Sequence, residues 1–265
     1  MQSVFDELYE NSLAKCEFKN LISIITAEEN IRLAYRNLKK NAGSRTPGTD
    51  GKTIADLAKM SEPELIGFVQ QKFNWYQPQS VRRKEIPKGN GKTRPLGIPT
   101  IMDRLIQQCV LQVMEPICEA KFCETSNGFR PNRGVENALA QAEKHMQKSN
   151  LHIVIDIDIK GFFDNVNHGK LLRQIWAMGI HDKKLLSIIS AMLKAEVAGI
   201  GFPEKGTPQG GILSPLLSNI VLNELDWWIT SQWVGMPTRH EYSGKIHENG
   251  TKDQSKKYRE LRKTN

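Results

Sequence analysis

The sequence predicts an α+β protein that combines amphipathic helices with a β-hairpin and short strands. Several segments carry apolar residues three and four positions apart, which indicates amphipathic helices; residues 101–119 are the longest of them. A basic segment at residues 81–99 has Gly-Asn-Gly at its centre and predicts a β-hairpin. Residues 151–160 alternate apolar and polar side chains, which is typical of a strand with one buried face.

The composition is that of a folded, basic protein. Its 265 residues carry a formal net charge of +8, which favours an anionic partner, most commonly nucleic acid. A membrane surface is the next most common anionic partner of a basic protein. No apolar run approaches the roughly 18 residues of a transmembrane helix, so such a helix is excluded. We expect no membrane partner. The four cysteines form no Cys-x-x-Cys pair, so we expect reduced thiols in a cytoplasmic protein rather than a zinc site.

The first 80 residues are expected to be mainly helical. Residues from about 3 to 40 show helical periodicity, and Thr26 and Glu29 have the spacing of a capping box. Near the end of this segment one face is apolar and the other is basic. The basic face fits either a solvated surface or a phosphate-binding one; its residues are Arg32, Arg36, Lys39 and Lys40.

A glycine-rich loop at residues 41–51 contains Arg45 and separates this helical segment from the next. Residues 53–75 again show helical character. Within them Ser61 is the expected N-cap, Pro63 lies in the first turn, and Glu64 stands where a capping box needs it.

The hairpin predicted at residues 81–99 is unusually basic. Two strands offer little core of their own, and like charges on neighbouring strands repel each other. An anionic ligand explains such a charge density better than folding does. The cations are Arg82, Arg83, Lys84, Lys88, Lys92 and Arg94.

Thr100 is expected to cap the helix at residues 101–119. The segment NGFRPNRG, residues 127–134, has the composition of a loop and places Arg130 and Arg133 before another helix at about 134–147.

Two carboxylates lie on one face of the strand predicted at residues 151–160. Asp156 and Asp158 are two positions apart, so they would stand about 7 Å from each other, because a strand rises roughly 3.3 Å per residue. From these residues alone, the face is either an ordinary polar strand face or a site for a cation.

Beyond the strand the sequence returns to helix. Asn167 is the expected cap of a helix through about residue 178, and a second helix covers about 182–193. Asp164 and His168 are expected to be turn and cap residues. Residues 196–201 predict a short strand, and the segment GTPQGG follows at 206–211. Ser214 and Pro215 predict the start of a last helix with an expected buried stripe of Leu217, Val221, Leu225 and Trp228.

Four motifs in this order resemble those of the reverse transcriptases encoded by bacterial group II introns, also called intron maturases. They are IPKGNGKTRPLGIP, NGFRPNRG, DIDIKGFFDNVNH and GTPQGGILSPLLSNIVLNELD. The glycine-rich loop NAGSRTPGTDG resembles part of that family's N-terminal extension. The resemblance covers residues from about 25 to 230.

The resemblance implies the fingers and palm of a right-hand polymerase, with an antiparallel palm sheet backed by helices and a helical N-terminal extension. The implied divisions are 1–80 for the extension and the start of the fingers, 81–147 for the fingers and 148–238 for an incomplete palm. Residues 239–265 are expected to form a charged connector.

The resemblance also implies the catalytic site. Asp158 matches the family's first catalytic aspartate, and the motif places Mg²⁺ at Asp158 and Ile159. Such polymerases join nucleotides with two metal ions about 4 Å apart. The motif assigns no metal to Asp156, which is expected at most near the metal's outer shell.

Other motif positions imply contacts with nucleotide and RNA. Lys88 and Arg94 match residues that hold the incoming triphosphate, and Phe163 matches the ring that excludes a 2′-hydroxyl, although core packing also explains a phenylalanine there. Gln209 matches a residue that touches nucleotide and template. Template-path contacts to backbone and 2′-hydroxyl are implied for Arg130 and Arg133.

The implied partners are group II intron RNA, an RNA template with a DNA primer, and deoxynucleoside triphosphates, in a ribonucleoprotein of the bacterial cytoplasm. Members of the family also form homodimers through the fingers and palm, so a homodimer is a further expectation.

One departure from the family pattern changes the expected activity. The family's second acidic motif, Tyr-Ala-Asp-Asp, does not occur in these 265 residues. We therefore expect little or no polymerase activity from this chain alone. The main alternative is a non-catalytic RNA-binding module that assists splicing. A retron or CRISPR-associated reverse transcriptase is a third interpretation, which the NAGSRTPGTDG and NGFRPNRG segments disfavour.

Overall fold

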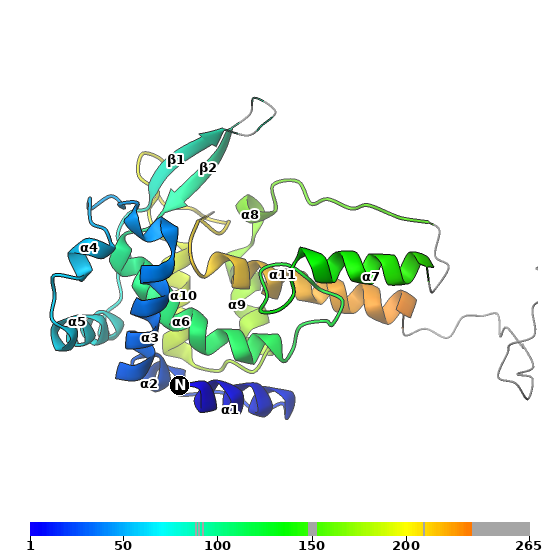
Figure 1. Ribbon diagram of the computed structural model, residues 1–265, viewed down its shortest axis with the longest axis horizontal. Helices are drawn as coiled ribbons and strands as arrows, with labels where there is room; N and C mark the ends of the chain where they lie inside the picture. Colours follow the sequence, from blue (N-terminus) through cyan, green and yellow to red (C-terminus); the bar gives the residue numbers. More distant parts are fainter. Residues whose placement is uncertain (88, 90, 92, 148–152, 209, 235–265) are drawn as a thin grey trace, which may run out of the picture. The chain divides into compact units, whose positions relative to one another are not determined.

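The computed structural model describes residues 1–87, 89, 91, 93–147, 153–208 and 210–234. The chain divides into two units, Met1–Asp226 and Trp227–Asn265, and the fold described below is that of the first. Figure 1 shows the order of the elements along the chain. They are α1 (Gln2–Leu13), α2 (Leu21–Ile25), α3 (Glu28–Lys40), the 3₁₀ helix η1 (Ala42–Arg45), α4 (Ile54–Leu57), α5 (Glu62–Asn74), β1 (Arg82–Pro87), β2 (Thr93–Ile98), α6 (Ile101–Glu119), α7 (Val135–Gln147), α8 (Phe162–Asn165), α9 (His168–Ala177), α10 (Lys183–Leu193), α11 (Ser214–Ile229) and the π-helical segment η2 (Thr230–Val234).

Helix α6 is the centre of the hydrophobic core. As predicted, it covers Ile101–Glu119 and begins at Thr100, whose Oγ1 accepts a hydrogen bond of 3.3 Å from the backbone N–H of Asp103. Its side chains are buried on several faces. On one side, α1, α2 and α3 pack along it. A helix that is apolar around most of its circumference is stable only when neighbours surround it.

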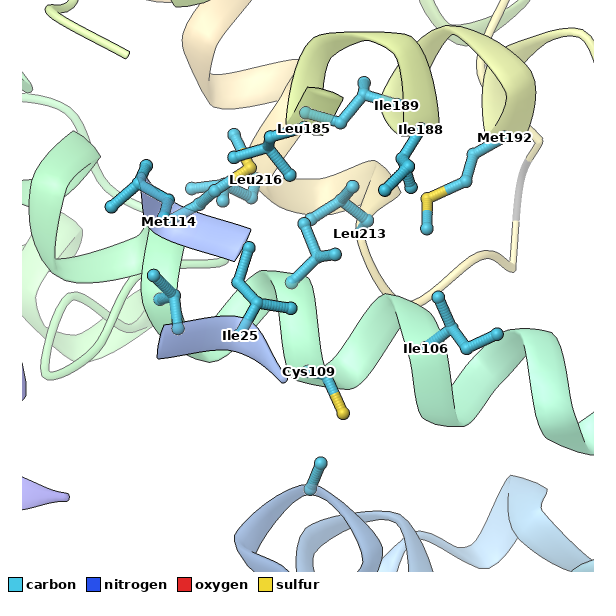
Figure 2. Close-up of a cluster of buried hydrophobic side chains, with 14 of the residues drawn as sticks. Ile25, Ile106, Cys109, Met114, Leu185, Ile188, Ile189, Met192, Leu213 and Leu216 are labelled. Carbon is cyan, nitrogen blue, oxygen red and sulfur yellow. The ribbon is translucent and has the colours of Figure 1, made fainter. Parts of the chain in front are cut away.

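A second group of helices covers the rest of α6. In Figure 2, Ile106 of α6 lies on the side that faces Ile188 and Met192 of α10, whereas Cys109 points away from α10. Each fully buried aliphatic side chain in such a cluster contributes about 1.5–3 kcal/mol through removal from water. The labelled residues of the cluster are Ile25, Ile106, Cys109, Met114, Leu185, Ile188, Ile189, Met192, Leu213 and Leu216.

A buried polar network joins α3 to α6. The amide nitrogen of Asn30 donates to the carbonyl oxygen of Cys109 at 3.1 Å, and Nε2 of Gln112 donates to Oδ1 of Asn30 at 2.7 Å. Because these groups are buried, the bonds satisfy polar atoms that would otherwise cost free energy of folding. The network fixes the register between the two helices.

The N-terminal helical prediction is confirmed in its extent, but the helix is broken into α1, α2 and α3. The predicted apolar face of α3 is confirmed, since Ile31, Ala34 and Leu38 are buried. The capping box at Thr26 is wrong: Ala27 is the N-cap of α3, and the hydroxyl of Thr26 donates to the carbonyl oxygen of Ile22 at 2.8 Å. The hydroxyl serves the end of α2 because α2 ends immediately before it.

The Ser61 capping box of α5 is confirmed. The backbone N–H of Ser61 donates to Oε2 of Glu64 at 2.8 Å, and the hydroxyl of Ser61 donates to the same oxygen at 2.7 Å. The helix predicted at 53–75 is nevertheless interrupted, because α4 ends at Leu57 and α5 begins at Glu62.

The predicted basic hairpin is confirmed as β1 and β2. The strands pair antiparallel from Arg82 opposite Ile98 to Pro87 opposite Thr93. Figure 1 shows them side by side. Among the described residues this is the only sheet.

The strand predicted at residues 151–160 is not formed. Residues 151 and 152 lie outside the described part, and residues 153–159 are in no strand. They form an extended connection between α7 and α8 (Figure 1). A strand needs a neighbour for its N–H and C=O groups, and no other described segment pairs with this one. The apolar side chains are consequently exposed; Ile155 is 80% exposed.

Two smaller predictions also fail. Residues 196–201 form isolated bridges rather than a strand: Val197 bridges Val81 and Gly201. The expected buried stripe of α11 ends early, because Leu217 is buried whereas Leu225 is exposed and Trp228 is 53% exposed. The core in the described residues reaches only the first half of α11, so periodicity alone overstated its buried length.

Candidate nucleotide and RNA site

Asp158 lies in the extended segment that leads into α8. Its side chain and that of Asp156 are exposed. The segment ends at Gly161, whose φ of 61° is in the left-handed region that glycine adopts without strain. The amide nitrogen of Asn165 donates to the carbonyl oxygen of Gly161 at 2.9 Å and closes the turn of α8. The turn fixes where the aspartate segment ends, while the aspartates stay accessible.

The GTPQGG segment is attached to α8 and α9 by backbone hydrogen bonds. The N–H of Thr207 donates to the carbonyl oxygen of Phe163, and the N–H of Gly206 donates to that of Val166, both at 2.8 Å. Nε2 of the buried His168 donates to the carbonyl oxygen of Gly206 at 2.7 Å. His168 is the first residue of α9, and its hydrogen bond also holds this loop in place. The sequence did not indicate this second role.

The same segment touches the base of the hairpin. Gly210 has a φ of +113°, and a Cβ there would lie 2.5 Å from the carbonyl oxygen of Gly97. Only glycine allows this approach. On the far side, the N–H of Ile212 donates to Oε1 of Gln107 at 2.8 Å. Three elements far apart in sequence thus meet here: α8, the GTPQGG segment and the hairpin.

The predicted nucleotide-binding residues are only partly described. Lys88 and Gln209 lie outside the described residues. Arg94 is exposed on β2 opposite Ile86. Phe163 is half-buried, and its ring lies edge-on to that of Phe162 with centroids 5.6 Å apart. Phe162 packs against the core, as expected. The role of Phe163 against the 2′-hydroxyl stays a prediction.

Arg130 and Arg133 both make hydrogen bonds within the protein. The guanidinium of Arg130 donates twice to Oε2 of Glu119, at 3.1 and 2.9 Å, and its side chain is 4% exposed. It also donates to the carbonyl oxygens of Cys123 and Ser126, each at 2.8 Å. Arg130 therefore organises the NGFRPNRG loop in this conformation.

Arg133 is less enclosed than Arg130. It donates to the carbonyl oxygen of Glu124 at 2.7 Å and is half-buried. Immediately before Arg130, Phe129 has a φ of 53° and is 71% exposed. Their contacts with RNA remain predictions.

The predicted basic face of α3 divides into one paired cation and three accessible ones. Nε of Arg32 donates to Oε1 of Glu62 at 2.5 Å, and its NH2 group lies 3.2 Å from Glu28. These carboxylates raise the pKa of Arg32 and offset its charge. Arg36, Lys39 and Lys40 are exposed. Their charges make α3 a basic surface near its C-terminal end.

The glycine-rich loop that carries Arg45 is held by a residue that the sequence did not single out. Arg104 of α6 is buried, and its guanidinium donates to the carbonyl oxygens of Gly43 and Thr46 at 2.7 and 2.6 Å. Burial lowers the pKa of Arg104. Gly48 lies close to Thr100, because a Cβ at position 48 would be 2.6 Å from the Cα of Thr100. Arg45 itself is exposed on this fixed loop.

A buried carboxylate also ties the segment before the hairpin to α6. Asp103 accepts hydrogen bonds from the hydroxyls of Tyr76 and Thr100 at 2.9 and 2.7 Å, and from the N–H of Gln79 at 3.1 Å. Burial raises the pKa of the Asp103 carboxyl above its ordinary value. This cluster positions the segment before β1. Apart from the acidic residue in the first turn of α6, no sequence pattern predicted it.

The carboxylate oxygens of Asp158 and its neighbour Asp156 are ligands of the type that a hard cation such as Mg²⁺ prefers. They supply part of a site, because no group of three His, Cys, Asp or Glu residues converges in the part of the chain that the structure describes. In that same part, no helix has both the length and the apolar character needed to cross a membrane.

Residues 86–247 match the family described as reverse transcriptase (RNA-dependent DNA polymerase). The chain is 35% identical over 231 residues to Protein YkfC of Escherichia coli, covering 84% of this chain and 60% of that protein. It is 38% identical over 240 residues to the group II intron-encoded protein LtrA of Lactococcus lactis, covering 86% of this chain and 38% of LtrA.

More distant relatives and a solved structure extend these similarities. The putative COX1/OXI3 intron 1 protein of Saccharomyces cerevisiae is 29% identical over 85% of this chain and 26% of its own length. A chain of the partial Cas6-RT-Cas1–Cas2 complex matches with a TM-score of 0.50 and 22% identity, covering 80% of this chain and 35% of that one. The structural match shows a shared fold.

Proposed function

Because this chain belongs to the reverse transcriptase family, among whose members it matches group II intron-encoded proteins, we propose that it serves RNA-directed DNA synthesis and assists intron splicing. The observation that carries the proposal is the meeting of α8, the GTPQGG segment and the basic hairpin. This meeting brings the segment after Asp158 to the elements that would hold a nucleotide.

We assign the parts of a right-hand polymerase to the chain as the sequence motifs imply them. Residues 1–80 form a helical extension and the start of the fingers, 81–147 the fingers, 148–238 part of the palm, and 239–265 a charged connector. The fold similarity to the Cas6-RT-Cas1–Cas2 chain supports the general architecture.

Asp158 and Ile159 are the residues that would hold Mg²⁺. The exposed Asp158 carboxylate offers oxygen ligands, and Ile159 offers its backbone carbonyl oxygen. When bound, Mg²⁺ would lower the barrier by stabilising negative charge on the transferring phosphoryl group. The exposed guanidinium of Arg94 and the ammonium of Lys88 would neutralise the triphosphate of a deoxynucleotide.

The RNA partners are group II intron RNA and an RNA template with its DNA primer. Arg36, Lys39, Lys40 and Arg45 are exposed and available to phosphates. Arg32 would contribute less, because two glutamates already pair with it. The protein would act in complex with intron RNA, as a ribonucleoprotein in the bacterial cytoplasm. A homodimer is compatible with this function.

Primer extension on an RNA template with Mg²⁺ tests the catalytic assignment, using the natural protein that contains this sequence. Asp158→Ala should lower the extension rate about a thousandfold or more, because it removes a carboxylate from the metal site. The matched control is Asp156→Ala, which should change the rate less than about tenfold because that carboxylate is no direct ligand in this assignment. Full activity in Asp158→Ala would contradict the assignment.

A non-catalytic RNA-binding splicing module is the second candidate. The exposed cations of α3 and Arg45 support it, because binding of RNA phosphates needs no metal site. Wild-type protein that stimulates intron splicing without extending a primer, and that keeps this stimulation in Asp158→Ala, would establish the module. In both candidates RNA affinity should fall as salt rises, because phosphate contacts release counterions.

A further inference from the structure

Two buried side chains from outside the GTPQGG segment hold its two ends. At its start, Nε2 of His168 donates to the carbonyl oxygen of Gly206 at 2.7 Å. Directly after its end, Oε1 of Gln107 accepts a hydrogen bond of 2.8 Å from the N–H of Ile212. His168 is 6% exposed and Gln107 is 7% exposed. Because a carbonyl oxygen only accepts and a backbone N–H only donates, His168 must act as a donor and Gln107 as an acceptor.

The backbone at the end of the segment lies close to Gln107. A Cβ at Gly211 would be 3.3 Å from Oε1 of Gln107 and 2.8 Å from Oγ of Ser214. That hydroxyl donates to the carbonyl oxygen of Pro208 at 2.8 Å, and the N–H of Gly211 donates to the same oxygen at 3.1 Å. This end of the segment is therefore bonded within itself and also fixed to α6.

Helix α6 supports the hairpin as well as the segment. Asp103 and Gln107 are four positions apart, so they lie on the same face of the helix, one turn apart. Asp103 accepts from the N–H of Gln79, three residues before β1, at 3.1 Å. Between these two anchors, Gly210 meets Gly97 of the hairpin. One buried helix thus sets the position of the segment relative to the hairpin.

The segment lies between the groups that we assign to the nucleotide site. The N–H of Thr207 bonds to the carbonyl oxygen of Phe163 in α8, the helix that follows Asp158. Gly210 lies against β2, the strand that carries Arg94. A misplacement of about 1 Å in such a site can cost about a hundredfold in rate. Side chains that hold this segment can therefore affect nucleotide addition without touching the nucleotide.

We propose that Gln107 and His168 are positioning residues for nucleotide addition, which hold the GTPQGG segment so that α8 and the hairpin can contact one deoxynucleoside triphosphate together. The inference rests on the proposed function, RNA-directed DNA synthesis. Because the segment would contact the nucleotide before and during the reaction, loss of either bond should raise KM and leave kcat nearly unchanged. A general loss of stability would instead reduce the amount of active protein, which lowers apparent kcat and leaves KM alone.

Primer extension on an RNA template at varied deoxynucleotide concentration tests the role of Gln107, using the natural protein that contains this sequence. Gln107→Met removes the acceptor and keeps a side chain of similar length. It should raise KM for the deoxynucleotide about ten- to a hundredfold, with kcat within about threefold of the wild-type value. A wild-type KM in Gln107→Met would overturn the assignment of Gln107.

Gln112 provides the matched control, because it lies on the same helix and is also 7% exposed. Its Nε2 donates to Oδ1 of Asn30, away from the GTPQGG segment. Gln112→Met should lower the melting temperature by several degrees, because Asn30 loses a buried partner, and should leave KM unchanged. If Gln112→Met raised KM as much as Gln107→Met does, the effect would be one of stability and the positioning role would be overturned.

His168 gives a second test at the other end of the segment, which also decides the matter if Gln107→Met does not fold. His168→Gln keeps an Nε2 donor, whereas His168→Leu has none. We expect KM to rise about tenfold or more in His168→Leu and to stay near the wild-type value in His168→Gln. An equal KM in these two variants, raised or not, would contradict a role for the hydrogen bond to Gly206.

The same assay separates failure of the inference from failure of the proposed function. Wild-type protein that extends no primer would overturn RNA-directed DNA synthesis, and the inference with it. Wild-type protein that extends primers, while Gln107→Met and His168→Leu keep its KM, would overturn the positioning role alone.

Discussion

Helix α6 and the segment 153–159 are both rich in apolar residues, yet these residues lie in opposite environments. Ile106 of α6 is 0% exposed, whereas Ile155 of the extended segment is 80% exposed. Both isoleucines occur in clear periodic patterns, one helical and one alternating. The pattern of apolar residues therefore predicts the conformation that a segment favours. Whether its side chains are buried depends on which other segments pack against it.

The difference between the two regions follows from their backbone hydrogen bonds. A helix satisfies its interior N–H and C=O groups within itself, so the backbone of α6 needs no partner segment for its hydrogen bonds. A strand has no such internal partners and needs another strand beside it. Residues 153–159 have no partner strand among the described residues. Their alternating apolar and polar side chains are therefore not part of a sheet.

Amide hydrogen exchange should show the largest contrast between these regions. Amides in the middle of α6 should exchange on the order of a thousandfold more slowly than those of residues 153–159, because opening α6 requires disrupting the core. Mass spectrometry of proteolytic peptides measures this directly. Equal protection would mean that the extended segment pairs with a strand in solution.

Truncating one isoleucine in each region tests the same comparison energetically. Ile106→Ala should lower the free energy of unfolding by about 2–5 kcal/mol, because it removes buried methylene groups and leaves a cavity. Ile155→Ala, the matched control, should change it by about 0.5 kcal/mol or less. Urea denaturation measures both. A cost above about 2 kcal/mol for Ile155→Ala would show that this side chain is buried in solution.

Arg104 and Arg36 offer a smaller version of the contrast. Arg104→Met should destabilise the protein by about 1–3 kcal/mol, because the carbonyl oxygens of Gly43 and Thr46 lose their donors. Arg36→Met should be close to neutral in stability, since Arg36 is exposed. Limited proteolysis should cut within residues 42–50 faster in Arg104→Met. An unchanged cleavage rate would contradict the role of Arg104 in holding this loop.

Local features of the fold were predictable from the sequence. The bounds of α6, the Ser61 capping box, the Asn167 cap and the basic hairpin are confirmed. Each depends on interactions among residues close in the chain, so neighbouring residues carry the information. The motifs that marked Phe163, Arg94 and Gln209 were also readable, although their roles remain predictions and Gln209 lies outside the described residues.

Features that depend on distant residues were not predictable in this way. Nothing in the sequence indicated that Arg130 would close on Glu119, that Arg104 would hold residues 43–46, or that His168 would clamp Gly206. These partners are separated by up to 61 positions, as between Arg104 and Gly43. The residue type and charge of an arginine do not reveal whether its side chain faces solvent or a buried carboxylate.

The sequence by itself determined the reverse transcriptase family, the basic character and the helices of the core, because motifs, charge and helical hydrogen bonds are local properties. The tertiary structure alone decided which cations remain accessible and how the GTPQGG segment meets α8 and the hairpin. It also decided that the alternating residues around Asp158 stay exposed. The reason is physical: strand pairing, ion pairing and cavity walls all require atoms that the chain brings together only by folding.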